Sequence, residues 1–177
     1  MKRKLLASML PLLLSLPLLA ADVTSTVSPL LAKGDYAEAA KLLKPLAAAG
    51  DAVAQYHLGM LHYNGQGVPE DEKAAVDLLT GSANQGNIDA MFQLGNAFVF
   101  GNETPRLVAD ADQEAARWYF KAASAGHAEA QYALGLLFIV GKGVQRNIEE
   151  ADRWMQQAAK NGHKEAQNYM SLKKNGR

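Results

Sequence analysis

Apolar residues recur every three or four positions along most of this chain, which is the spacing of one face of an α-helix. Ala90, Leu94 and Phe98 show the pattern within residues 88–100. Extended along the sequence, the pattern predicts three pairs of helices. The first helix of each pair is expected at Ala52–Asn64, Ile88–Phe100 and Ala128–Val140, and the second at about Asp71–Gln85, Asp112–Ala125 and Ile148–Asn161.

The same residue types return along the chain at nearly constant steps. Gly50, Gly86, Gly126 and Gly162 are separated by 36, 40 and 36 residues. Self-similarity at such a period indicates an array of helical repeats. Six further columns keep these steps through one shared insertion of four residues: Ala39, Ala75, Ala115 and Ala151; Ala47, Ala83, Ala123 and Ala159; Ala54, Ala90, Ala130 and Ala166; Leu58, Leu94, Leu134 and Met170; Gly59, Gly95 and Gly135; and Gly65, Gly101 and Gly141.

Glycine in the middle of a predicted helix needs a packing reason, because it costs about 1 kcal/mol of helix stability relative to alanine. Gly59, Gly95 and Gly135 occupy that position in the three first helices. We expect each glycine to allow close approach of the second helix in its pair, with small alanines facing the contact. At the start of the last second helix, Asn147 and Glu150 have the spacing of a capping box.

The two ends of the array are predicted to be incomplete repeats. Residues 28–50 form a half-repeat in which Ser28 and Pro29 open a short helix, and residues 35–49 form a second helix kinked at Pro45. Full repeats follow at about 51–86, 87–126 and 127–162. Residues 164–173 form a capping helix that covers the open face of the last repeat.

At these columns the chain resembles the Sel-one-like repeat family, a subtype of tetratricopeptide-like repeats. The resemblance lies in "AQYHLGMLHYNGQGVPED" from Ala54 and "AQYALGLLFIVGKGVQRN" from Ala130. The middle repeat departs from it, because "NETPRLVADADQ" follows Gly101 in place of a short glycine-containing loop. The resemblance implies an all-α, right-handed α-solenoid of helix-turn-helix repeats over residues 22–177. It also implies a concave binding face and a role as a protein-binding scaffold in an envelope or secretory pathway.

Residues 1–21 have the order of a secretory signal peptide. A basic start at residues 2–4 precedes an apolar stretch at residues 5–19 and the small residues Ala20 and Ala21. The alternative, an uncleaved anchor, is disfavoured because the apolar stretch is shorter than a span of roughly 20 residues and contains two prolines. We therefore expect a periplasmic protein, or alternatively an extracellular one, with no stable membrane anchor after cleavage.

Charge and cysteine content narrow the classes of partner. The chain has 18 basic and 18 acidic side chains, so loss of residues 2–4 leaves it mildly acidic. Nucleic acid is not an expected partner, because its binding requires a basic surface. The chain has no cysteine, so an exported form has no disulfides and is stabilised by packing alone.

The sequence offers no clear catalytic, cofactor or metal site. His57 and His62 are five residues apart and lie on different helix faces. Residues Asp110, Asp112 and Glu114 alternate like the start of a calcium loop, but the glycine and the final carboxylate of such a loop are missing. Some cysteine-rich relatives within the resembling family are linked to β-lactam binding, and a chain without cysteines is not expected to share that activity.

A second apolar stripe on the first helices is the predicted partner-binding surface. It lies away from the expected core, and an apolar anchor is the usual source of interface energy. The alternative is that the stripe packs between first helices of adjacent repeats. The loop Asn102–Gln113 is expected to add specificity, since insertions in solenoids are often functional. The predicted contacts are Met60, Tyr63, Asn64, Asn96, Phe100, Leu136 and Val140, with Glu103, Asp110 and Asp112 in the loop region.

These features predict a non-catalytic protein-binding module that acts as an adaptor or regulator in the periplasm. The alternative is an immunity protein or inhibitor that neutralises an envelope-targeted toxin. An enzyme that binds or hydrolyses β-lactams is the least favoured alternative. The predicted partner in the favoured cases is another protein.

Overall fold

The computed structural model describes residues 23–176, and within them the chain forms nine α-helices, one short 3-10 helix and no strand. The predicted first helices coincide with the observed α3, α5 and α7, and the predicted second helices agree with α4, α6 and α8 to within one residue at each end. In chain order the elements are α1 (Val23–Lys33), α2 (Tyr36–Ala48), α3 (Ala52–Asn64), α4 (Glu72–Asn84), α5 (Ile88–Phe100), η1 (Thr104–Leu107), α6 (Ala111–Ser124), α7 (Ala128–Val140), α8 (Ile148–Lys160) and α9 (Lys164–Lys174).

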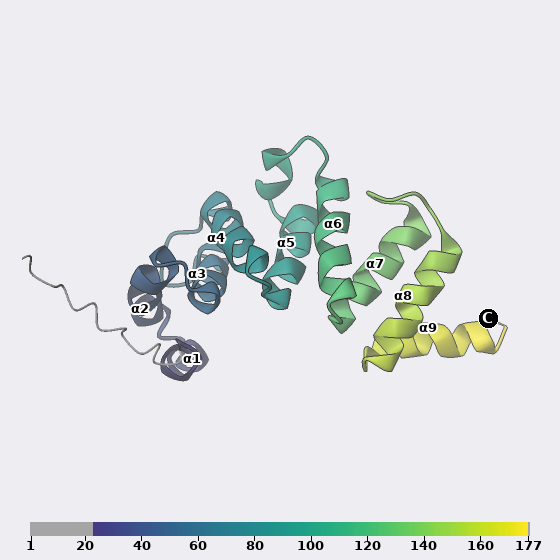
Figure 1. Ribbon diagram of the computed structural model, residues 1–177, viewed down its shortest axis with the longest axis horizontal. Coiled ribbons are helices and arrows are strands. Elements are labelled where there is room, and N and C mark those ends of the chain that lie inside the picture. Colours follow the sequence, from purple (N-terminus) through teal and green to yellow (C-terminus); the bar gives the residue numbers. More distant parts are fainter. Residues whose placement is uncertain (1–22, 177) are drawn as a thin grey trace, which may run out of the picture.

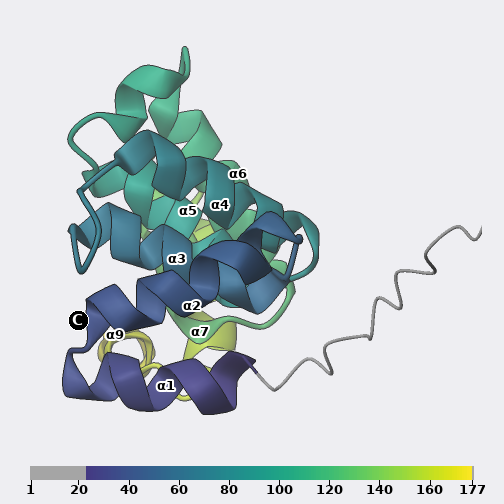
Figure 2. The same ribbon diagram turned by 90° about the vertical axis from the view of Figure 1, so that its left-hand side faces the viewer.

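The helices follow one another along an arched solenoid, with α1 at one end and α9 at the other (Figure 1). Viewed from the α1 end, the later repeats stack behind the first (Figure 2). The most extensive packing is within the hairpins α3–α4, α5–α6 and α7–α8, and each hairpin also packs on its neighbours in the chain. The predicted α-solenoid is therefore confirmed.

Small and large apolar side chains alternate through the core of the solenoid. The alanines of two repeat columns are completely buried, which lets helices approach closely, while Leu94 and Leu134 fill the space between hairpins. Leu58 and Phe98 are also buried, and Phe138 packs at the edge of the core. The buried alanine columns are Ala39, Ala75, Ala115 and Ala151, and Ala54, Ala90, Ala130 and Ala166.

The mid-helix glycines lie at close helix contacts, as predicted. A Cβ atom at Gly59 would lie 3.0 Å from Leu79 Cγ, and one at Gly135 would lie 3.0 Å from Met155 Cε. The tightest contact is in the middle repeat, where a Cβ at Gly95 would lie 2.5 Å from two ring carbons of Tyr119. Glycine therefore sets the spacing of all three hairpins.

The first helix of each repeat begins at a side chain that accepts a hydrogen bond from a first-turn amide. The acceptor is Asp51 in α3 and Asn87 in α5, and the amide donors lie three residues further along. In α7 and α9 the same place is taken by His127 and His163, whose Nδ1 atoms accept from the third amide at 3.3 Å. These caps satisfy donors that the helix itself leaves unpaired.

The predicted capping box of α8 is only half present. Asn147 Oδ1 accepts hydrogen bonds from the amides of Glu149 and Glu150 at 3.0 and 3.1 Å. The amide of Asn147 donates to the Phe138 carbonyl, and the Glu150 carboxylate pairs with Arg153 instead of returning to that amide. The longer reach of arginine gives this carboxylate a charged partner on the same helix.

Helix α1 begins earlier than predicted. Helix α1 already includes Val23, so Ser28 and Pro29 do not open it and Pro29 lies inside the helix. The buried side chains Val23 and Val27, one turn apart, explain this longer helix because both pack into the first core cluster. Helix α2 runs through Pro45. The predicted signal peptide lies outside the described residues, and no helix within 23–176 has the length and apolar character to cross a membrane.

The last helix covers the end of the solenoid. Helix α9 packs on α8, with Ala166 buried and Tyr169 and Met170 against the last core cluster. The Tyr169 hydroxyl donates to Asp152 Oδ1 at 2.9 Å, and the Lys173 ammonium pairs with the same carboxylate. Residues after α8 thus seal the apolar face that the last repeat leaves open.

Candidate binding surface

The predicted stripe contains the most exposed large apolar side chains of the first helices. Phe100 is 74% exposed at the end of α5, and Val140 is 66% exposed at the same repeat position in α7. Leu136, one turn before Val140, is 41% exposed. Packing between adjacent first helices, the alternative explanation of the stripe, does not cover these three side chains. We call Phe100, Leu136 and Val140 the first-helix surface.

The remaining residues of the predicted stripe are more enclosed. Met60 is half-buried and packs against the central core cluster, while Asn64 is exposed at the end of α3. Tyr63 is half-buried, and burial, together with the nearby carboxylates of Glu72 and Glu70, raises the pKa of its phenol. Its hydroxyl therefore stays protonated at neutral pH and remains available as a hydrogen-bond donor.

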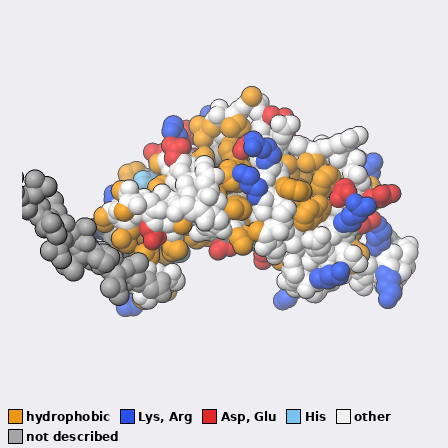
Figure 3. All heavy atoms as spheres, viewed as in Figure 1, with side chains coloured by type: hydrophobic (Ala, Val, Ile, Leu, Met, Phe, Trp, Pro, Cys, Tyr) orange, Lys and Arg blue, Asp and Glu red, His pale blue; other side chains and the backbone are white. Residues whose placement is uncertain are grey.

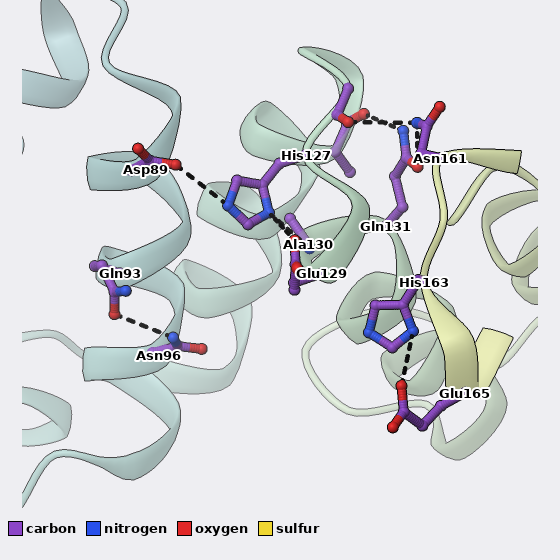
Figure 4. Close-up of polar contacts among 12 residues, drawn as sticks. Asp89, Gln93, Asn96, His127, Glu129, Ala130, Gln131, Asn161, His163 and Glu165 are labelled. Carbon is purple, nitrogen blue, oxygen red and sulfur yellow. Dashed lines mark hydrogen bonds and ion pairs between the residues drawn. The ribbon is translucent and has the colours of Figure 1, made fainter. Parts of the chain in front are cut away.

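Asn96 is tied into the hairpin by its own hydrogen bonds. Its Oδ1 accepts from the Tyr119 hydroxyl at 2.8 Å, and its amide nitrogen donates to Gln93 Oε1 at 3.2 Å. Figure 4 shows Gln93 and Asn96 side by side on one helix. Asn96 thus positions the buried Tyr119 ring against Gly95, a structural role that the sequence did not reveal.

The loop after α5 is anchored to the preceding repeat by a buried carboxylate. Glu72, at the start of α4, accepts hydrogen bonds from the amides of Asn102, Glu103 and Thr104 at 2.7–2.9 Å, and from the Thr104 hydroxyl at 2.7 Å. Burial alone would raise the pKa of Glu72, but these bonds outweigh it and lower the pKa to about 2. Thr104 itself is completely buried. The insertion is therefore built into the core at its base.

Most carboxylates of this loop region have partners within the chain. Asp110 caps α6 by accepting from the Gln113 amide at 2.9 Å, and Asp112 pairs with Lys142 of the next loop at 3.2 Å. Glu114 pairs with Arg117 at 2.8 Å. Glu103 is exposed. Glu103 and Asp110 are both exposed, but Asp110 already caps α6 and Asp112 is already paired with Lys142.

The histidines join successive repeats. The His127 ring stacks on Phe92 with centroids 4.5 Å apart, and its Nε2 lies 3.5 Å from Asp89 of the preceding first helix. His163 repeats the stacking on Tyr132 at 4.2 Å. Figure 4 shows both rings at the starts of their helices. Among the described residues, no group of three or more His, Asp or Glu side chains is placed to hold a metal ion.

One short sequence bears on acyl-enzyme chemistry. Ser171 and Lys174 have the Ser-x-x-Lys spacing of penicillin-binding enzymes. Both side chains are exposed on the last turns of α9. An acyl-enzyme serine needs a neighbouring base and donors for a developing oxyanion in a site that limits water. An exposed helix end does not provide that setting.

Comparison with known proteins identifies the repeat. The model of the Sel1 repeat matches residues 30–51, 52–87, 88–127 and 128–163, so the chain belongs to the Sel1 repeat family. It is 31% identical to a Sel1 repeat protein from Oxalobacter formigenes, with a TM-score of 0.72 over 81% of this chain and 57% of that one. It is also 31% identical to a protective antigen of uropathogenic Escherichia coli, with a TM-score of 0.71 over 84% of this chain and 32% of that one.

Curated relatives are much longer than this chain. An uncharacterized protein of Neisseria meningitidis is 37% identical over 64% of this chain, and the match spans 22% of that protein. A chitin synthase regulator of Malassezia restricta is 30% identical over 61% of this chain and 7% of its own length. Sel1 repeats mediate protein–protein interactions, and proteins of this family are generally non-catalytic interaction modules.

Proposed function

We propose that this chain is a periplasmic adaptor or regulator that binds another protein through the first-helix surface. The observation that carries the proposal is the exposure of Phe100 and Val140 at equivalent positions of adjacent repeats. Large apolar side chains that the scaffold leaves in water become favourable anchors when a partner buries them. Leu136 extends the surface, and Asn64 and Glu103 provide polar groups at its edge.

The test begins by identifying a partner and continues with purified components. The chain from residue 22, used as bait in a periplasmic extract, yields candidate partners, and each is then purified and titrated by calorimetry. Phe100→Ala and Val140→Ala are each expected to weaken binding about tenfold, because loss of a buried anchor costs 1 kcal/mol or more. Their helicity and unfolding midpoints are expected to match those of the unmodified protein, since both side chains are exposed.

Ile148→Ala is the matched control for this surface. Ile148 is 38% exposed, but it begins α8, a second helix, whereas the first-helix surface lies on α5 and α7. This control is expected to bind the partner like the unmodified protein. Equal affinities for all three variants would place the interface elsewhere. The contribution of the loop is tested with the point variant Leu107→Ser. A shortened loop is not used, because shortening would remove the buried Thr104 and leave Glu72 without its hydrogen-bond donors.

The periplasmic part of the proposal makes a separate prediction. The order of charged, apolar and small residues in the first 21 positions supports export followed by cleavage. The mature protein is expected to begin near Ala21 or Asp22, as measured by N-terminal sequencing of material from the periplasmic fraction. Recovery of a chain that still begins at Met1 would contradict processing, and it would leave the protein-binding proposal to be tested separately.

A further inference from the structure

A groove between α6, α7 and the loop after α7 is separate from the first-helix surface. Its volume is about 470 Å³, within the range of ligand-binding pockets. Figure 3 shows apolar side chains gathered between α6 and α8, beside basic side chains over α6. The residues that line the groove are Gln113, Ala116, Arg117, Phe120, Lys121, Leu134, Phe138, Gly143 and Val144.

The charged residues that line the groove are both basic. Arg117 and Lys121 lie one turn apart on α6, and the lining contains no carboxylate. Arg117 donates to Glu114 on its own helix at 2.8 Å, which leaves further guanidinium donors for a ligand. The Lys121 ammonium lies 3.8 Å from the centre of the Trp118 ring. The groove therefore offers positive charge beside an apolar floor.

The sister repeats show that the fold does not require these groove residues. At the position of Phe120 the other second helices carry Lys44, Thr80 and Gln156, all polar. Phe120 is nevertheless 52% exposed, with its ring edge-on to Trp154 at a centroid distance of 5.8 Å. The position of Lys121 is occupied elsewhere by Pro45, Gly81 and Gln157. An exposed aromatic ring and an adjacent ammonium have thus been added to a scaffold that folds without them.

We propose that this groove binds an acidic peptide segment that carries a large apolar side chain between its carboxylates. The apolar side chain would lie against Phe120, Phe138 and Val144, where it displaces water from an apolar floor. The carboxylates would face Lys121 and Arg117, since guanidinium and ammonium groups make strong charge-assisted hydrogen bonds to them. This proposal is independent of the first-helix surface.

Three probe peptides separate the apolar and the charged contributions. The acidic probe is acetyl-Glu-Glu-Phe-Leu-Glu-amide, the basic probe replaces each glutamate with lysine, and the small probe replaces phenylalanine and leucine with alanine. They are titrated into the nitrogen-15-labelled chain from residue 22 and followed by amide chemical shifts. Saturable shifts at residues 113–121 and 143–144 are expected with the acidic probe. No saturable shift with it, or equal affinity for the basic or the small probe, would overturn the proposal.

Variants taken from the sister repeats give a test that preserves the fold. Phe120→Thr and Lys121→Gln introduce residues that the same positions carry at Thr80 and Gln157. Each variant is expected to bind the acidic probe about tenfold more weakly than the unmodified protein does, with unchanged helicity. Phe100→Ala, on the other surface, is expected to bind the probe normally. Unchanged affinity in Phe120→Thr would overturn the proposal.

Two other possible ligands of the groove, a lipid anion and a second copy of the chain, can be distinguished from an acidic peptide by experiment. Laurate offers an apolar chain and one carboxylate without a peptide backbone. Saturable amide shifts with laurate and none with the acidic probe would show that the groove binds a lipid anion and not a peptide. A second copy of the chain would appear in sedimentation velocity as a dimer that Phe120→Thr dissociates. Either result would overturn the assignment to an acidic peptide.

Discussion

Replacing Glu72 with glutamine is expected to lower the free energy of unfolding by about 3 kcal/mol at neutral pH. The carboxylate accepts four hydrogen bonds from the Asn102–Thr104 segment, whereas a glutamine has one acceptor oxygen and would turn an NH₂ group toward donors. The buried amide or hydroxyl of Thr104 would then lose its acceptor, which costs more than the same loss at the surface, where water replaces it. Urea unfolding followed by circular dichroism measures the difference.

The loss is expected to depend on pH in a defined direction. The pKa of Glu72 is about 2 in the folded chain, below the ordinary value of about 4.3 for an unfolded one. A carboxyl with a lowered folded pKa stabilises the fold fully above its unfolded pKa, and this contribution disappears as pH falls towards the folded pKa. The stability gap between the unmodified protein and Glu72→Gln should therefore narrow between about pH 5 and pH 2.

Glu70→Gln is the matched control, because it removes an exposed carboxylate two residues away on the same segment. Its unfolding midpoint at neutral pH is expected to stay within experimental error of the unmodified protein. A Glu72→Gln protein that unfolds at the same urea concentration as Glu70→Gln would show that the loop is not anchored through this carboxylate. Hydrogen exchange of the Thr104 amide provides a second, local readout, with faster exchange expected in Glu72→Gln.

The helices could be predicted closely because their signals are local. Apolar spacing placed α3, α5 and α7, and repeated columns fixed which residues are equivalent. Gly95 could be identified as a contact glycine because it costs helix stability and still recurs in the repeats. The start of α1 was missed because Pro29 is typical of a first turn, yet tertiary packing of Val23 and Val27 extends the helix past it.

The role of Glu72 could not be read from the sequence, because its partners lie 30–32 residues further along the chain. A carboxylate in the first turn of a helix is already explained by the helix dipole, so nothing local marks it as a loop anchor. Asp110 and Asp112 looked equally available for a partner, and only the fold shows that they serve a cap and an ion pair. The repeat columns mark Phe120 as an aromatic residue where the sister repeats have polar ones, but its exposure depends on which neighbours surround it and needed the fold.

Gly95→Ala, in the middle hairpin, is the second variant that is expected to lose much stability. A methyl group there would lie 2.5 Å from carbons of the Tyr119 ring, which is 3% exposed and held by its hydroxyl bond to Asn96. Because the ring is rigid and fixed at both ends, the helices must move apart, at a net cost of about 2 kcal/mol. Gly135→Ala meets the flexible end of Met155 at 3.0 Å and is expected to be nearly neutral.

The pair of variants isolates the contact, because both gain the same helix propensity from alanine, about 1 kcal/mol. Met155 occupies the same repeat position as Tyr119, so Tyr119→Met gives the middle hairpin the flexible side chain of its neighbour. Tyr119→Met alone should cost stability, since it removes the hydrogen bond to Asn96. In that background Gly95→Ala is expected to cost much less, and a double-mutant cycle of urea midpoints should give a coupling of about 1–2 kcal/mol. Additive losses would mean that the ring is not what excludes a side chain at Gly95.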